Sequence, residues 1–116
     1  MIDVYGLKNC DTCKKAIQWL GETGIQYVFH DVRAEALTAA QVATWVKELG
    51  SATLVNRRGT TWRKLSPDDQ AKAGTADGAR DVILDNPSVM KRPVFDLGHE
   101  RLVGFNDDIQ AALRQL

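Results

Sequence analysis

Two cysteines, Cys10 and Cys13, have the residue type and spacing in this chain that could do chemistry. Three positions apart on the first turn of a helix, their sulfur atoms would lie close enough for a disulfide. A thiol at a helix N-terminus meets unpaired backbone N–H groups and the positive end of the helix dipole, which favour the thiolate. Further positive charge comes from Lys8, Lys14 and Lys15. The pattern predicts a redox couple, with Cys10 as the attacking thiolate and Cys13 as the resolving thiol.

Three other interpretations of the cysteine pair stay open at this point. A structural disulfide that closes so short a loop would add little stability. A zinc site would need two further ligands, and the two histidines, His30 and His99, are not in a paired spacing. Cys13 could also be an ordinary small core residue on a helix face. We expect working thiols and no metal ion.

The residues around the pair predict a strand, a tight loop, a helix and a second strand. β-Formers over residues 2–5 give way to a glycine turn, and an apolar stripe over residues 16–20 indicates a helix that Gly24 ends. A second strand follows over residues 27–31. In such a unit the loop that carries Cys10 lies at the carboxyl edge of the sheet, where open α/β folds bind ligands.

A capping box predicts the next helix. Thr38 and Gln41 precede an apolar stripe over residues 42–49, which repeats at helical spacing. Gly50 is expected to stop this helix in the left-handed conformation.

The segment after residue 50 is less regular, with a turn around Gly59. Short helices are expected from Ser66 and from Thr75, and the second of these must end before Pro87. The segment also holds a basic group: Arg57, Arg58, Arg63 and Lys64. This group is either a solvated face or a patch for an anion or a partner.

The C-terminal part predicts a β-hairpin and a closing helix. Residues 94–95 and 102–105 pair across a turn at Gly98-His99, and either Asn106 or Asp107 caps the last helix. Strand–helix–strand followed by a hairpin and a helix is the layout of a thioredoxin-like α/β domain with helices inserted between its halves.

Pro93 stands at the start of the first hairpin strand. Sterics alone admit a proline at that position of an edge strand. The functional interpretation is a cis Arg92–Pro93 bond packed against the cysteine loop, which would let Arg92 hold its guanidinium over the Cys10 thiolate or over a substrate oxyanion.

Composition excludes several function classes. The chain has 116 residues, enough for one domain with a real core. Lys plus Arg and Asp plus Glu each number 15, so no overall field favours nucleic acid or a membrane surface. No segment resembles a spanning helix or a signal peptide, and we expect a cytoplasmic protein that binds neither nucleic acid nor membrane directly.

Four segments of the chain resemble the arsenate reductase (ArsC) family, and within it the branch that contains Spx and YffB. They are YGLKNCDTCKKAIQWL, LVNRRGTTWRKL, NPSVMKRPV and RLVGFNDD. The middle and KRPV segments resemble YffB most, whereas a CxxC with both cysteines resembles Spx. The resemblance covers the whole chain and implies a single thioredoxin-like domain, with a mixed four-stranded sheet and a helical insertion at about residues 38–87.

Carried over residue by residue, the resemblance makes Cys10 the nucleophile, Arg92 the oxyanion-binding arginine and Pro93 the cis-proline. Two further arginines of arsenate reductases fall here on Asn56 and Gly104. A multiply charged oxyanion needs several charge-assisted donors, so arsenate reduction with glutaredoxin is the least favoured activity.

The sequence therefore supports two functions of different classes. The first is a thiol-dependent reductase in which Cys10 attacks, Cys13 or a second glutathione resolves, and Arg92 assists. Glutathione is the expected co-substrate, with a glutaredoxin or thioredoxin as the other possible thiol partner and no bound cofactor. Substrate and thiol contacts are expected from Asp11, Thr12, Lys14, Arg57, Arg58 and Pro93.

The second function is an Spx-like regulator that binds the RNA polymerase α-subunit, with Cys10–Cys13 as its redox switch. Gly50 lies where the Spx-type partner surface would be, although a glycine there is also typical of a helix C-cap.

Overall fold

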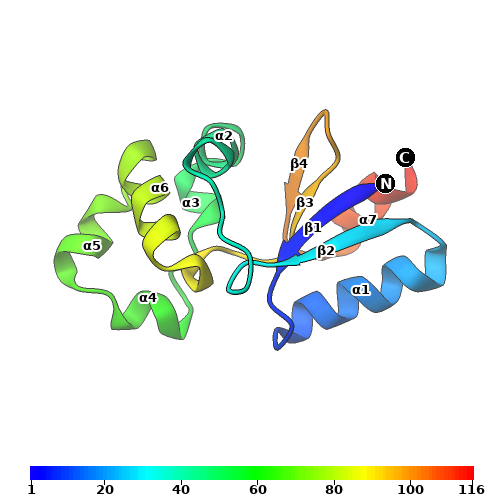
Figure 1. Ribbon diagram of the computed structural model, residues 1–116, viewed down its shortest axis with the longest axis horizontal. Coiled ribbons are helices and arrows are strands. Elements are labelled where there is room, and N and C mark those ends of the chain that lie inside the picture. The colour runs from blue at the N-terminus through cyan, green and yellow to red at the C-terminus, as the bar shows by residue number, and fades with distance from the viewer. The chain divides into compact units, whose positions relative to one another are not determined.

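The computed structural model describes residues 1–116, which form four strands, seven α-helices and one 3₁₀-helix (Figure 1). The chain divides into two compact units. The sheet unit combines Met1–Ala34 with Arg92–Leu116, and the helical unit is Glu35–Lys91. The segment predicted as an insertion, residues 38–87, falls within the helical unit.

The sheet unit contains a mixed four-stranded sheet in the order β2-β1-β3-β4. Its strands are β1 (Ile2–Gly6), β2 (Tyr27–Asp31), β3 (Val94–Asp96) and β4 (Arg101–Val103). β1 pairs with β2 in parallel and with β3 antiparallel, and β3 pairs antiparallel with β4. The predicted parallel unit and hairpin are both confirmed.

Two helices cover one face of this sheet (Figure 1). Helix α1 (Asp11–Thr23) ends at Gly24, as predicted, and helix α7 (Asp107–Arg114) starts at the cap Asn106. Alternate residues of a strand point to one face, so the apolar side chains of β1 and β3 meet those of both helices. The resulting core consists of Ile2, Val4, Ala16, Leu20, Phe95 and Leu113.

The opposite face of the sheet carries two polar pairs. The His30 ring stacks on Tyr5, with the ring centroids 4.6 Å apart, and its Nε2 lies 2.8 Å from an Asp3 carboxylate oxygen. On the hairpin, Nε of Arg101 lies 3.4 Å from a carboxylate oxygen of Asp96. These pairs give His30 a structural role in the sheet.

The helical unit is built on two amphipathic helices, α2 (Ala39–Leu49) and α6 (Ala76–Asp85). Their apolar stripes bury Val42, Trp45, Val46, Ala79, Val82 and Ile83. The predicted caps are present at Thr38, which forms the full capping box, at Ser66 before α5 (Pro67–Lys72), and at Thr75.

Two predictions for the segment around residue 50 are wrong. Gly50 has φ 86° and ψ 145°, so it has a positive φ but not the left-handed helical conformation, and helix α3 (Ser51–Leu54) follows at once. Residues 60–64, predicted as irregular, form helix α4 (Thr60–Lys64). Helices of four and five residues are too short to show an apolar period in the sequence.

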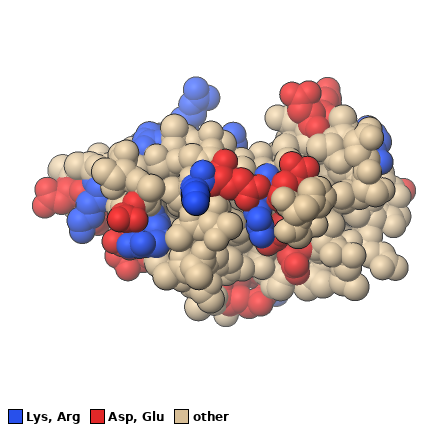
Figure 2. Space-filling model, turned by 90° about the horizontal axis from the view of Figure 1, so that it is seen from above, with Lys and Arg blue, Asp and Glu red and all other residues tan.

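The surface carries both signs of charge. Figure 2 shows basic and acidic side chains interspersed on the face in view, which agrees with a formal net charge of zero. None of the helices combines the length and the apolar character that crossing a membrane requires.

Candidate functional site

Cys10 occupies the N-cap of α1, directly before its first helical residue, Asp11. The backbone at Cys10 is extended, with φ −97° and ψ 121°, and its carbonyl accepts the first helical hydrogen bond from the Lys14 N–H at 2.9 Å. The Cys10 N–H in turn donates to the Leu7 carbonyl at 3.3 Å, which closes the loop after β1. The predicted position of Cys10 at the helix start is therefore confirmed.

The site lowers the pKa of the Cys10 thiol. Partial burial is the largest influence and opposes ionisation, but it is outweighed by the Cys13 N–H, the Cys13 thiol and the Arg92 guanidinium. The Cys13 amide completes no cap hydrogen bond to the Cys10 sulfur, yet it is near enough to stabilise negative charge there. Cys10 consequently favours the thiolate more than a free cysteine does.

Sheet topology explains how Arg92 reaches a residue far away in the sequence. Tyr5 of β1 is paired with Val94 of β3, and because the two strands are antiparallel, β3 begins where β1 ends. Arg92 and Pro93 precede Val94 and so lie at the same sheet edge as the loop that leads to Cys10. The Arg92–Pro93 peptide bond is cis, as predicted, and the carbonyl of the buried Pro93 accepts a hydrogen bond from the Gly104 N–H at 2.8 Å.

Cys13 has the opposite environment. It is 2% exposed on the inner face of α1, and burial raises its pKa to about 12. A contact from the Leu7 backbone lowers this value only in part, and the neighbouring Cys10 raises it further. The pair is therefore asymmetric, because the Cys10 sulfur ionises far more readily than the Cys13 thiol.

Gly6 makes room for the Cys13 sulfur, a role that sequence reasoning missed. A Cβ at Gly6 would lie 2.5 Å from Cys13 Sγ and 3.4 Å from Cε1 of Phe29. Such a contact is closer than van der Waals packing allows. The sequence signal was a glycine within a run of β-formers, where it marks a close approach rather than the predicted turn.

The other predicted contact residues fall into two groups. Asp11, Thr12 and Lys14 are exposed on the first turn of α1, in the sheet unit beside Cys10. Arg57 and Arg58 belong to the helical unit, where they line a pocket of about 420 Å³ together with Val55, Asn56 and Lys91. A substrate contact from any of these residues stays a prediction.

The Arg57 side chain is already held in place within that unit. Its Nη2 donates to the Ala73 carbonyl at 3.3 Å, and its guanidinium carbon lies 5.2 Å from the centre of the Trp62 ring. The Arg58 N–H donates to the Asn56 side-chain oxygen at 3.1 Å. The side chain of Arg57 and the backbone of Arg58 are therefore fixed at a pocket lined by three cationic residues.

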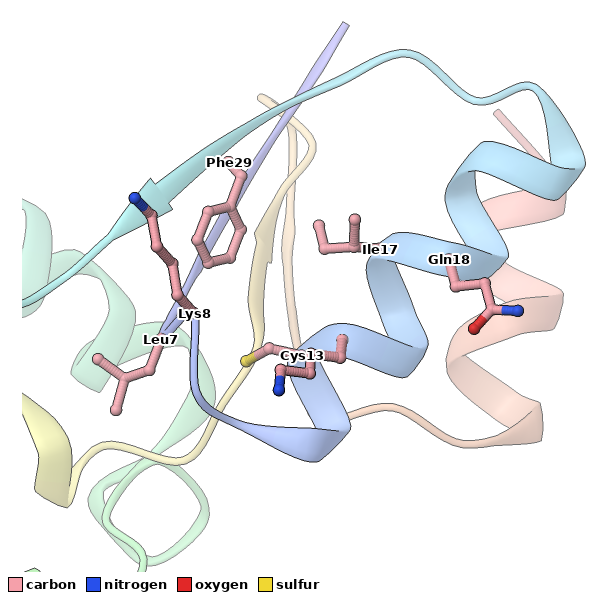
Figure 3. Close-up of a pocket in the computed structure, with 7 residues that line it drawn as sticks. Leu7, Lys8, Cys13, Ile17, Gln18 and Phe29 are labelled. Atoms are coloured by element: carbon pink, nitrogen blue, oxygen red, sulfur yellow. The ribbon is translucent and has the colours of Figure 1, made fainter.

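A second pocket lies in the sheet unit, directly beside Cys13, and sequence reasoning missed it as well. It measures about 380 Å³ and is lined by Leu7, Lys8, Cys13, Lys14, Ile17, Gln18 and Phe29. Figure 3 shows the Cys13 sulfur on the side of the helix that faces Leu7 and Phe29. Its members come from the loop after β1, from α1 and from β2, so only the folded sheet brings them together.

Comparison with known proteins agrees with this geometry. The ArsC family matches residues 5–113. The chain belongs to the ArsC family. A solved structure named YffB is 42% identical, with a TM-score of 0.91 over 97% of this chain and 98% of that one. The thioredoxin-like fold with a mixed four-stranded sheet is thus confirmed.

Two curated relatives cover most of this chain at different levels of identity. A protein of Haemophilus influenzae described as uncharacterized is 41% identical over 97% of this chain and 98% of its own length. The global transcriptional regulator Spx of Staphylococcus saprophyticus is 32% identical over 93% of this chain and 82% of its own length. This ArsC-family chain is therefore more similar to YffB than to Spx.

Proposed function

We propose that this ArsC-family protein is a glutathione-dependent thiol reductase with Cys10 as its nucleophile. The observation that carries the proposal is the environment of the Cys10 sulfur, where two groups of Cys13 and the Arg92 guanidinium stabilise the thiolate. Thiolates, not thiols, attack disulfides, so this sulfur is suited to exchange at neutral pH.

The reaction has two exchanges. The Cys10 thiolate attacks the glutathione sulfur of a mixed disulfide, forms a Cys10–glutathione disulfide and releases the substrate thiolate, which takes a proton. The thiolate of a second glutathione then attacks the glutathione sulfur bound to Cys10, so that glutathione disulfide leaves and the Cys10 thiolate returns. One free glutathione is consumed for each mixed disulfide reduced, and its sulfur leaves joined to the glutathione sulfur of that mixed disulfide as glutathione disulfide.

Resolution by free glutathione is favoured over resolution by Cys13. The Cys13 thiol is buried, and its pKa of about 12 keeps it protonated at neutral pH. Before any reaction this thiol donates a hydrogen bond to the Cys10 sulfur, and so it stabilises the Cys10 thiolate. When glutathione is scarce, Cys13 loses its proton and attacks the Cys10 sulfur of the Cys10–glutathione disulfide, which releases glutathione as a thiolate and leaves a Cys10–Cys13 disulfide. A glutaredoxin or thioredoxin would then reduce that disulfide.

The exposed groups around Cys10 suit a peptide thiol with an ammonium group and carboxylates. Asp11 would pair with the ammonium group, and Lys14 with a carboxylate, while Thr12 offers a hydroxyl. The buried Pro93, in its cis bond, would fix the position of Arg92 beside the sulfur. Arg57 and Arg58, in the helical unit, are of the residue type that suits an anion contact, because guanidinium groups bind carboxylates with two parallel hydrogen bonds.

The test is reduction of hydroxyethyl disulfide by glutathione, with glutathione disulfide measured through glutathione reductase and NADPH. Cys10→Ser should fall to the uncatalysed rate, and Cys13→Ser, the matched single-atom change, should keep turning over. Arsenate with glutaredoxin should give no turnover. A Cys10→Ser variant as active as the wild type would refute the proposal.

Similarity to Spx supports a second candidate, a redox-switched regulator that binds RNA polymerase. The supporting observations are the CxxC spacing and 32% identity to an Spx protein. A pull-down with the C-terminal domain of the polymerase α-subunit, run with oxidised and reduced protein, separates the candidates. Retention that depends on the Cys10–Cys13 disulfide and vanishes in Gly50→Arg would favour the regulator.

A further inference from the structure

The pocket beside Cys13 combines an apolar interior with a cationic mouth. Leu7 and Cys13 are buried, and Ile17 and Phe29 are half-buried and pack against the sheet-unit core. The polar side chains of the lining are exposed: Lys8, Lys14 and Gln18. Its volume of about 380 Å³ lies in the range of small-molecule sites.

Two of the residues that line this pocket, Cys13 and Phe29, pack closely around Gly6. A Cβ on Gly6 would meet both of these side chains. The pocket is an open recess, and Figure 3 shows Leu7, Cys13, Ile17 and Phe29 among the side chains around it. Water in such an apolar recess has few polar partners, so an apolar group displaces it favourably.

The two lysines at the mouth are not equivalent. The Lys8 N–H donates to an Asp31 carboxylate oxygen at 3.2 Å, and the Lys8 charge helps to hold the pKa of that carboxyl below its usual value, after the larger effect of the Arg33 N–H. The Asp31 carboxylate therefore lies close to the Lys8 backbone and near the charge of its side chain. Lys14 projects from the exposed side of α1. An anionic group at the mouth would therefore be favoured at Lys14, because the negative charge of Asp31 near Lys8 repels it.

We infer that this pocket binds a small amphipathic carboxylate, with its apolar chain on Leu7, Ile17 and Phe29 and its head group at Lys14. Charge complementarity selects the anionic head, and the apolar lining selects the chain. The inserted end of the chain lies against the Cys13 sulfur. A bound ligand therefore fills the pocket through which a reagent would reach the buried Cys13 and slows its modification, while Cys10, which does not line the pocket, stays accessible.

Calorimetric titration of the reduced full-length protein with octanoate tests the site. We expect saturable binding, and binding of 1-octanol, the neutral analogue, that is roughly two- to fivefold weaker because it lacks the ion pair. Lys14→Glu should weaken octanoate binding about fivefold or more. Lys15→Glu is the matched control, because it makes the same charge change on the next residue of the same helix turn and does not line the pocket. Both variants should fold, since acidic residues are favourable near a helix N-terminus.

Filling the cavity gives an independent test. Ile17→Trp should abolish octanoate binding, and Cys13 in a Cys10→Ser background should react more slowly with a methanethiosulfonate reagent when octanoate is present. The second measurement needs no cavity variant and holds if Ile17→Trp fails to fold. The inference is overturned if octanoate does not bind, if Lys14→Glu and Lys15→Glu weaken binding equally, or if octanoate leaves the Cys13 rate unchanged. These measurements do not depend on turnover. They therefore test the ligand site even if the hydroxyethyl disulfide assay shows no reductase activity.

Discussion

The sheet unit and the helical unit contain pockets of similar volume, about 380 and 420 Å³, with contrasting linings. The first is apolar inside and is bounded by the candidate resolving cysteine, Cys13. The second is lined by Arg57, Arg58 and Lys91 with Asn56. The sheet unit therefore holds both cysteine sulfur atoms, and the helical unit holds a pocket lined by three cationic residues.

The units also differ in how the chain builds them. The sheet unit joins the first 34 residues to the last 25, so its site depends on pairing between strands that are distant in sequence. The helical unit is one continuous segment, and its elements are set by local caps and helical stripes. Arg92 can act on Cys10 because β3 pairs with β1, so packing defects in the two units should have different chemical consequences.

The largest effect should come from core truncations that compare the units. Phe95→Ala removes a fully buried ring of the sheet-unit core and should cost about 3–5 kcal/mol. Ile83→Ala, its counterpart in the helical unit, should cost about 2–5 kcal/mol. Urea unfolding measures both. Only Phe95→Ala loosens β3, which begins two residues after Arg92, so only this variant should raise the Cys10 pKa, measured from alkylation rate against pH.

An equal rise of the Cys10 pKa in Phe95→Ala and Ile83→Ala would contradict this contrast. It would mean that the helical unit contributes to the cysteine site as strongly as β3 does.

An intermediate effect is expected from Gly6→Ala. The added methyl would overlap the Cys13 sulfur, and overpacking of this kind typically costs about 1–3 kcal/mol. The displaced Cys13 could no longer donate to Cys10 in the same geometry, so Cys10 should alkylate more slowly at neutral pH. Gly21→Ala is the matched control: its added methyl would meet no atom within 4 Å, and the helix should gain about 0.5–1 kcal/mol. Equal behaviour of the two alanine variants would show that Gly6 has no spacing role.

Much of the architecture could be predicted from local signals. The capping box at Thr38, the left-handed Gly24 and the stripes of α2 and α6 each act over one or two turns, and the sequence displays them directly. α3 and α4 were missed because so short a helix has no period, and its formation depends on tertiary packing. The left-handed conformation predicted for Gly50 was wrong because a glycine after a helix indicates a positive φ but does not determine ψ.

The candidate site also has features that the local sequence predicts and features that depend on strand pairing. The position of Cys10 at a helix start follows from the residues on either side of it, and its spacing to Cys13 is visible in the chain. The close approach of Gly6 to Cys13 and the pocket bounded by Phe29 depend on the parallel pairing of β1 with β2. Register cannot be counted from residue types alone, so these features required the structure.

The smallest effect on stability should come from Arg92, although its effect on reactivity is direct. Because Cys10 has a lower pKa in the folded chain than in the unfolded chain, its ionisation stabilises the fold above the ordinary cysteine pKa of 9, and this contribution is lost as pH falls through the folded value. Arg92→Met removes one of the groups that lower this pKa and should shrink the contribution by about 1 kcal/mol or less, given partial solvent screening. Arg92→Lys keeps the positive charge but loses the planar guanidinium, so its Cys10 pKa should lie between those of wild type and Arg92→Met. The rate of reaction with iodoacetamide, measured against pH, gives the Cys10 pKa in each variant. If the rate–pH curves of wild type and Arg92→Met coincide, the pairing of β3 with β1 brings Arg92 near the sulfur but has no effect on its ionisation.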